Sequence, residues 1–166
     1  MIFVMLSMSI ASVKRIYEVL MEKSDIVNQK NPLTEVSDGS IHFHHVYFDY
    51  GKDAENAALR DINLEIASGQ TIGILGGTGS GKSSLVQLLP RLYDVTSGEL
   101  FIGGHNVKEY DLKVLRDSVA MVLQNNVLFS GTIKDNLRWG KADASEEELI
   151  RVCQMAQADE FIRQFP

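Results

Sequence analysis

The chain has 166 residues, of which 45% are hydrophobic and 23% are charged, a balance that is typical of a globular domain and excludes a wholly disordered chain. Its formal net charge of -6 argues against a broad nucleic-acid surface, because binding to a phosphodiester backbone requires clustered Lys and Arg. The single cysteine, Cys153, leaves no internal disulfide and favours a reducing compartment.

The chain begins with an apolar stretch, Met1 to Ile10, which is interrupted only by two serines. About 20 apolar residues are needed to span a bilayer, so this stretch is too short. No basic residues precede it and no small-residue cleavage site follows, which disfavours a secretory signal peptide. Apolar residues continue at helical spacing through Leu20. We therefore expect residues 1–23 to be the C-terminal end of a membrane helix whose earlier part is absent.

The next stretches predict a linker and two strands. Residues 24–40 are polar and aperiodic, which is typical of a linker. Ile41 to Tyr50 is rich in aromatic and β-branched residues, and apolar residues alternate with polar ones from Ile62 to Ile66, so both predict strands. A polar turn, Gly51 to Asn56, separates them.

Helices and strands alternate in the middle of the chain. Thr71 to Leu75 predicts a short strand that enters a glycine cluster, and the helix after the cluster would bury Leu85 and Leu88. Glu99 to Ile102 and Val119 to Leu123 predict further strands with a glycine turn and a short helix between them. The pattern predicts a mixed α/β fold.

Near the end, Ser145 and Glu148 predict a capping box at the start of a helix. Leu149 and Cys153 would then share one face of this helix. We interpret Cys153 as a small buried hydrophobe rather than a reactive or metal-binding thiol.

The motif that carries chemistry is the run Gly76-Gly77-Thr78-Gly79-Ser80-Gly81-Lys82-Ser83, which matches G-x-x-x-x-G-K-[ST] in full. Glycines let the backbone wrap around phosphate oxygens. The Lys82 ammonium can reach the β and γ phosphates of ATP, and the Ser83 hydroxyl can bind Mg²⁺. A glycine-rich turn with an exposed lysine would explain neither the fourth glycine nor the hydroxyl. The motif therefore predicts ATP and Mg²⁺, but it leaves the task of the protein open.

At several separate stretches the sequence resembles the nucleotide-binding domain of ATP-binding cassette (ABC) exporters. Phe48-Asp49-Tyr50 resembles the aromatic loop that precedes the glycine motif in this family. The resemblance implies that Tyr50 stacks on adenine, although an ordinary core aromatic is the alternative. Gly73 to Ser84 is similar to the Walker A segment, with Ser84 where threonine is more usual.

Two later stretches extend the resemblance. Val122-Leu123-Gln124 resembles the Q-loop, which implies that Gln124 lies near Mg²⁺ and the attacking water. Leu128 to Ile133, followed by Asn136-Leu137, resembles the exporter segment that meets the coupling helices of the membrane domain.

The resemblance implies a P-loop NTPase core with an antiparallel β subdomain, in which residues 41–166 are the N-terminal part of the nucleotide-binding domain. It implies Lys82 and Gln124 as catalytic residues, Ser83 and Gln124 as metal-binding residues, and Tyr50, Gly76 to Ser84 and Gln124 as nucleotide-binding residues. The implied partners are the transmembrane domain of the same transporter and a second nucleotide-binding domain, in a homodimer or a heterodimer. The implied location is the cytoplasmic face of the cell membrane.

Four family motifs have no counterpart in the sequence: the L-S-G-G-Q signature, the Walker B aspartate, the glutamate beside it and the switch histidine. All four normally lie beyond the point where this chain stops. The resemblance therefore implies a fragment that binds ATP without appreciable hydrolysis. The substrate would be selected by membrane helices, so lipid, drug and peptide are equally open.

Three alternatives remain at this stage. Another P-loop protein, such as a small-molecule kinase or a GTPase, lacks its own signals, since no N-K-x-D guanine motif is present. The second alternative is a truncated product that only binds a nucleotide or a partner. It differs from an exporter domain in outcome and not in ancestry. His42 and His44 share a strand face, but two histidines make a weak metal site, and exposed residues of an edge strand explain them equally well.

Overall fold

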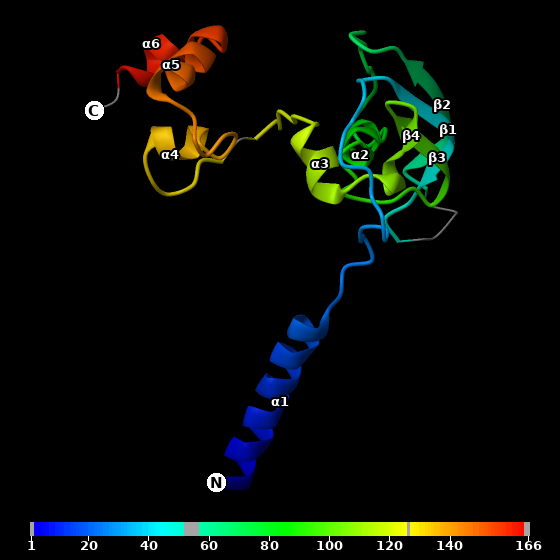
Figure 1. Cartoon of the computed structure of the whole chain (residues 1–166). Helices are drawn as coiled ribbons and strands as arrows, with labels where there is room; N and C mark the ends of the chain where they lie inside the picture. The colour runs from blue at the N-terminus through cyan, green and yellow to red at the C-terminus, as the bar shows by residue number, and fades with distance from the viewer. Residues whose placement is uncertain (1, 52–56, 126, 165–166) are drawn as a thin grey trace. The chain divides into compact units, whose positions relative to one another are not determined.

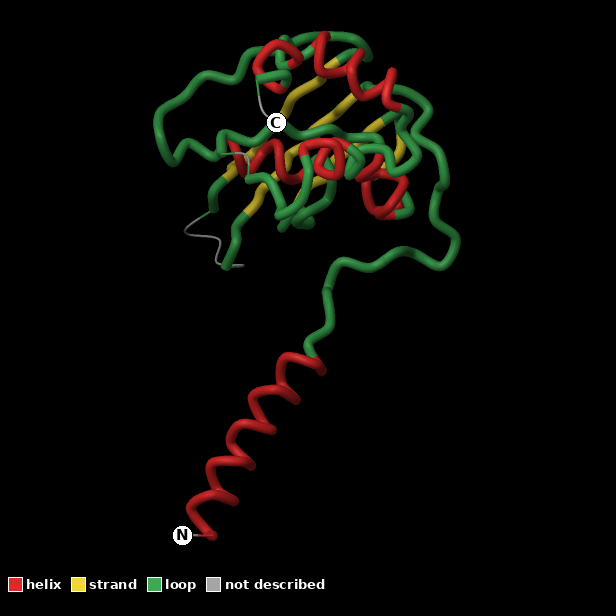
Figure 2. The backbone as a smooth tube through the Cα atoms, turned by 90° about the vertical axis from the view of Figure 1, so that its left-hand side faces the viewer, coloured by secondary structure: helices red, strands yellow, loops and turns green. Residues whose placement is uncertain are grey.

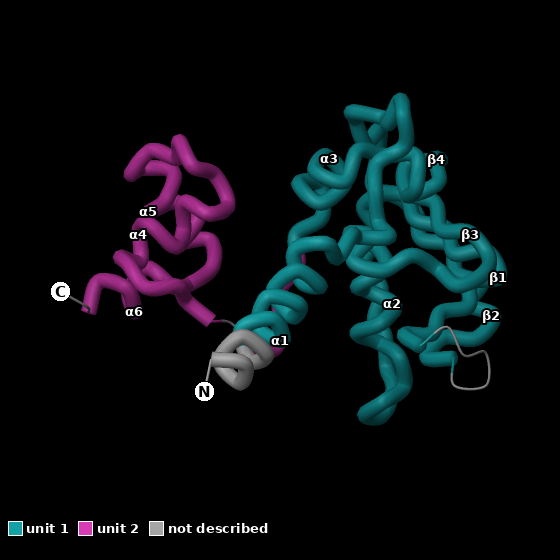
Figure 3. The backbone as a smooth tube through the Cα atoms, turned by 90° about the horizontal axis from the view of Figure 1, so that it is seen from below, with its two compact units in different colours: residues 1–120 teal, residues 121–166 magenta. Residues whose placement is uncertain are grey.

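The computed structural model describes residues 2–51, 57–125 and 127–164, with only the backbone for residues 2–8. The chain divides into two compact units, Met1–Ala120 and Met121–Pro166, which Figure 3 distinguishes by colour. The first unit holds one long helix, an antiparallel sheet and short helices, and the second holds helices alone among its described residues. The predicted turn from Gly51 to Asn56 lies largely outside the described residues.

The first unit begins with the long helix α1, Ile2–Met21, which runs without interruption in Figure 2. Several apolar side chains of this helix are exposed, including Val13, Ile16 and Leu20 at 64%, 59% and 74%. None of the helices in the described ranges combines the length and hydropathy that crossing a membrane would require.

The sheet of the first unit has four antiparallel strands in the order β2-β1-β3-β4 (Figure 1). They span Ile41–Phe48 (β1), Leu59–Ile66 (β2), Ser97–Ile102 (β3) and His105–Asn106 (β4). The expected antiparallel β subdomain is therefore present. Strand β1 pairs with both β2 and β3, so the prediction that its histidines lie on an edge strand is wrong. Alternation along a strand reveals its two faces but not its number of neighbours.

One face of this sheet is buried because apolar side chains project from it at strand periodicity. Val46 and Phe48 of β1 and Leu100 of β3 are almost inaccessible to solvent. Leu88 and Leu115 pack into the same cluster from the helices α2, Lys82–Leu88, and α3, Leu112–Asp117. The glycine motif therefore lies at the N-terminal end of a helix, α2, that packs into this core.

The segment before β1 has no helix or strand, yet it is fixed to the first unit by hydrogen bonds. The backbone of Leu33 bonds to the backbones of Glu109 and Asp111, next to the short 3-10 helix η2, Val107–Glu109. The side chain of Asn28 donates to the Asp111 carboxylate at 2.6 Å. Asp111 also caps α3 by accepting from Lys113 N and Val114 N.

Two predicted strands are absent, so those predictions are wrong. Neither Thr71 to Leu75 nor Val119 to Leu123 belongs to a strand. Leu75 is 97% exposed and Val122 is 93% exposed. A strand exists only when a neighbour accepts and donates its ladder hydrogen bonds. The four described strands pair with one another and not with these two apolar stretches.

The second unit contains the helices α4, Ile133–Leu137, α5, Glu146–Met155, and α6, Asp159–Ile162. The capping box that Ser145 and Glu148 predict is confirmed at the start of α5. Leu149 and Cys153 are buried, as expected from their shared face. A second capping box, between Thr132 and Asp135, begins α4. The sequence pattern does not predict this box, because its acidic residue is aspartate rather than the usual glutamate.

Candidate functional site: the glycine loop and its aromatic neighbours

The glycine loop folds back on the side chain of Lys82, the first residue of α2. The Lys82 ammonium donates to the carbonyl oxygens of Gly76 at 2.8 Å and Gly77 at 2.7 Å. It lies 3.3 Å from the Ser80 hydroxyl. A lysine has three hydrogens to donate and no acceptor. Its charge is therefore held over the loop rather than extended into solvent.

Left-handed backbone at two glycines makes this turn possible. Gly79 has φ +80° and Gly81 has φ +83°, a region that residues with a Cβ adopt only at a cost. Gly81 is also crowded, because a Cβ there would lie 2.6 Å from the carbonyl oxygen of Ala58 and 2.8 Å from Leu59 Cδ2. The sequence thus folds into a loop followed at once by a helix, as the motif predicts.

A hollow of about 280 Å³ opens beside this loop and brings together many of the predicted residues. The Lys82 side chain and the exposed Ser83 border it. The full set of lining residues is Tyr50, Ala58, Gly79, Ser80, Gly81, Lys82, Ser83 and Ser84. A positive side chain, a hydroxyl and an aromatic ring therefore meet at one place.

Tyr50 reaches the helix after the loop through its hydroxyl. This hydroxyl lies 3.0 Å from the Ser84 hydroxyl and donates to Gln87 Oε1 at 3.1 Å. Ser84 is buried, with 7% exposure. Its hydroxyl is therefore engaged by the aromatic side chain that the sequence analysis predicts as the adenine platform. Tyr50 itself is 54% exposed, so part of its ring is accessible.

Three of the predicted loop residues do not line this hollow. Gly76, Gly77 and Thr78 are exposed and belong to the loop but do not border the hollow. Gln124 is exposed and belongs to the second unit. Its role therefore stays a prediction.

The donor set fits a Mg²⁺-nucleotide better than a metal held by protein ligands alone. No group of three or more His, Cys, Asp or Glu side chains in the described ranges is arranged to hold a metal ion. Magnesium keeps several waters and commonly takes its other ligands from one or two protein oxygens and the phosphates of a substrate. The exposed hydroxyl of Ser83 suits that mode of binding.

Comparison with known proteins decides the family. A family sequence profile described as "ABC transporter" matches residues 59–166. The chain belongs to the ABC transporter family. The predicted exporter-type nucleotide-binding domain, with its P-loop core and antiparallel β subdomain, is therefore confirmed. The family match includes the whole glycine loop and begins after Tyr50.

Similar proteins agree with this ABC assignment. A Bacillus subtilis (strain 168) protein named as a multidrug export ATP-binding/permease protein is 43% identical over 162 residues, which are 97% of this chain and 28% of that protein. A Staphylococcus aureus (strain bovine RF122 / ET3-1) protein of the same description is 42% identical over 153 residues, which are 91% of this chain and 26% of that protein.

A solved structure extends the likeness to three dimensions. A bacterial Atm1-family ABC exporter with ATP bound matches 97% of this chain with a TM-score of 0.86 and 27% sequence identity. The chain covers 28% of that protein. It thus spans between a quarter and a third of the length of these ABC relatives.

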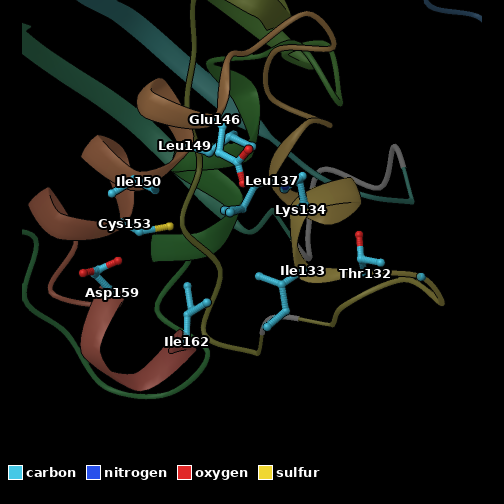
Figure 4. Close-up of a pocket in the computed structure, with 11 residues that line it drawn as sticks. Thr132, Ile133, Lys134, Leu137, Glu146, Leu149, Ile150, Cys153, Asp159 and Ile162 are labelled. Atoms are coloured by element: carbon cyan, nitrogen blue, oxygen red, sulfur yellow. Dashed lines mark hydrogen bonds and ion pairs between the residues drawn. The ribbon is translucent and has the colours of Figure 1, made fainter. Parts of the chain in front are cut away.

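The second unit of this ABC protein has a hollow of its own, of about 550 Å³. Figure 4 shows Ile133 of α4, Cys153 of α5 and Ile162 of α6 lining it. Although this hollow is larger than the one at the glycine loop, its wall is mainly apolar. Its lysine is paired, since Lys134 Nζ lies 2.8 Å from Glu146 Oε1. At the glycine loop, by contrast, the partners of the Lys82 ammonium among the described residues are carbonyl and hydroxyl oxygens.

Two contacts of Tyr50, with Gln87 and Tyr93, were not expected from the sequence. Gln87 lies three residues after Ser84 and therefore on the same face of α2, which is the one signal that could have found it. Tyr93 comes from the loop after α2 and contacts Tyr50 edge to face, with ring centroids 5.1 Å apart. No local pattern in the sequence indicates that contact.

Proposed function

We propose that this chain binds ATP with Mg²⁺ as part of the nucleotide-binding domain of an ABC exporter that couples ATP binding and hydrolysis to transport across the cell membrane. The observation that carries the proposal is the position of the Lys82 ammonium, 2.8 and 2.7 Å from two loop carbonyls in a complete phosphate-binding motif. Membership of the ABC transporter family supports it.

Each side chain has a distinct part in this proposal. Lys82 exchanges its loop carbonyl partners for the negatively charged β and γ phosphates, which are stronger acceptors for an ammonium. The hydroxyl of Ser83 would hold Mg²⁺, which would supply positive charge to the terminal phosphates. Tyr50 offers the accessible part of its ring to adenine. Gln124 would act near Mg²⁺ and the attacking water.

Further partners follow from the relatives. The chain would work with the transmembrane domain of its own transporter and with a second nucleotide-binding domain, at the cytoplasmic face of the membrane.

The segment from Leu128 to Leu137 would meet the membrane domain. It is ordered by Asn136, whose side chain accepts from Phe129 N at 2.8 Å and donates to Phe129 O at 2.9 Å. The names of the relatives favour multidrug export as the task of the whole transporter.

Binding of a fluorescent ATP analogue to the full chain, with and without Mg²⁺, tests the proposal. We expect Lys82→Ala to abolish the signal, because the phosphates lose their one full positive charge at this loop. Lys113→Ala is the matched control, since it removes an exposed lysine whose partner is Asp117 on the same helix. Equal binding by wild type and Lys82→Ala would refute the phosphate site. Stronger displacement by GTP than by ATP would instead favour a GTPase.

A further inference from the structure

The Tyr50 side chain is restrained by two ring contacts and by hydrogen bonds of its hydroxyl. Phe48, which is 2% exposed, meets it edge to face at 4.8 Å between ring centroids. Tyr93 meets it at 5.1 Å with the ring planes 87° apart. At the far end, the Tyr50 hydroxyl bonds to Ser84 and Gln87 at 3.0 and 3.1 Å. Such contacts restrict both side-chain torsions of a tyrosine.

The loop that carries Tyr93 is itself anchored by a two-point ion pair. Arg91 is 5% exposed, and its guanidinium donates to the two carboxylate oxygens of Asp94 at 2.7 and 3.1 Å. Arg91 also adopts φ +52°, an unusual backbone for a residue with a side chain. Its own carbonyl accepts from Arg116 at 3.1 Å. In the sequence, Tyr93 therefore lies between Arg91 and Asp94, which are bound to each other.

We propose that Gln87 and Tyr93 are positioning residues that hold the Tyr50 ring ready for a flat nucleobase. This inference rests on the proposed ATP function of the site. A free tyrosine side chain loses rotational freedom when a base stacks on it, and a ring that is already fixed avoids that cost. The two residues touch Tyr50 and are not among the residues that border the phosphate hollow. They therefore act on recognition of the base and not on recognition of the phosphates.

The experiment compares ATP with inorganic tripolyphosphate, which has phosphates but no base, as competitors of a fluorescent ATP analogue on the full chain. Gln87→Leu removes the acceptor for the Tyr50 hydroxyl, and Tyr93→Leu removes the ring contact. Each should weaken ATP about fivefold and change tripolyphosphate by less than about twofold. The matched controls are Gln87→Glu, which keeps an acceptor oxygen, and Tyr93→Phe, which keeps the ring. Both should keep the wild-type ratio of ATP to tripolyphosphate affinity, because the charge introduced by Gln87→Glu repels the two ligands alike.

The two competitors separate the possible failures. If the leucine variants leave the ratio of ATP to tripolyphosphate affinity unchanged, whether both ligands weaken together or neither does, the positioning role is refuted. If Lys82→Ala still binds like wild type, the proposed function fails and the positioning role falls with it. The two leucine variants lie on different elements, α2 and the following loop, so loss of folding in one leaves the other as the test. Thermal unfolding followed by circular dichroism identifies such a loss.

Discussion

The three glycines Gly77, Gly79 and Gly81 allow the strain in the phosphate loop to be measured in steps. A Cβ at Gly77 meets no atom within 4 Å, and its φ is not in the left-handed region. Gly79 is equally open but has φ +80°. Gly81 has φ +83° and would also place a Cβ 2.6 Å from the Ala58 carbonyl oxygen. Alanine therefore adds no strain at Gly77, backbone strain alone at Gly79, and backbone strain together with a steric clash at Gly81.

The expected free energies of unfolding follow that order. Gly77→Ala should be neutral or up to about 0.5 kcal/mol more stable, because alanine restricts the unfolded chain. Gly79→Ala should be about 1 kcal/mol less stable, the cost of a left-handed residue with a Cβ. Gly81→Ala should be about 3 kcal/mol less stable, because the clash with the start of β2 adds an overpacking cost.

Hydrogen exchange of backbone amides in β1 and β2, read by mass spectrometry, is the suitable assay. It reports on the first unit alone, whereas fluorescence of Trp139 would report on the second unit. Equal effects at Gly79 and Gly81 would refute the steric part of the reasoning. A destabilising effect at Gly77 as large as that at Gly79 would refute the backbone part.

Two further predictions concern ionic contacts in the first unit. Asp94→Ala should lower the free energy of unfolding by about 2 kcal/mol, because the buried Arg91 guanidinium loses its two-point acceptor. Urea unfolding followed by circular dichroism measures this change, and an unchanged free energy of unfolding would refute the prediction. The hydrogen bond from His45 to Asp61, at 2.6 Å, lowers the pKa of the Asp61 carboxyl. The resulting stabilisation is present above the unfolded-state pKa and is lost as the pH falls through the lower folded-state pKa. The melting temperature of Asp61→Asn should therefore fall less steeply than that of wild type on acidification, and parallel curves would contradict this.

The features that the sequence predicted correctly depend on local chemistry. The glycines, Lys82 and Ser83 lie within eight consecutive residues, so their spacing alone places an ammonium beside a tight turn at the start of a helix. The start of α5 is equally local, since Ser145 and Glu148 satisfy backbone groups within one turn. The resemblance to ABC exporters drew on several such short stretches and is confirmed by the family match.

Tertiary structure decided whatever depends on a distant partner. An apolar run such as Thr71 to Leu75 predicts a strand, but only a neighbouring chain segment can complete its ladder of hydrogen bonds, and in the described residues none does so. The environment of Tyr50 was hidden for the same reason. Its partners Ser84, Gln87 and Tyr93 lie more than 30 positions along the chain. Folding brings them together because the helix after the glycine loop packs against the sheet that ends beside Tyr50.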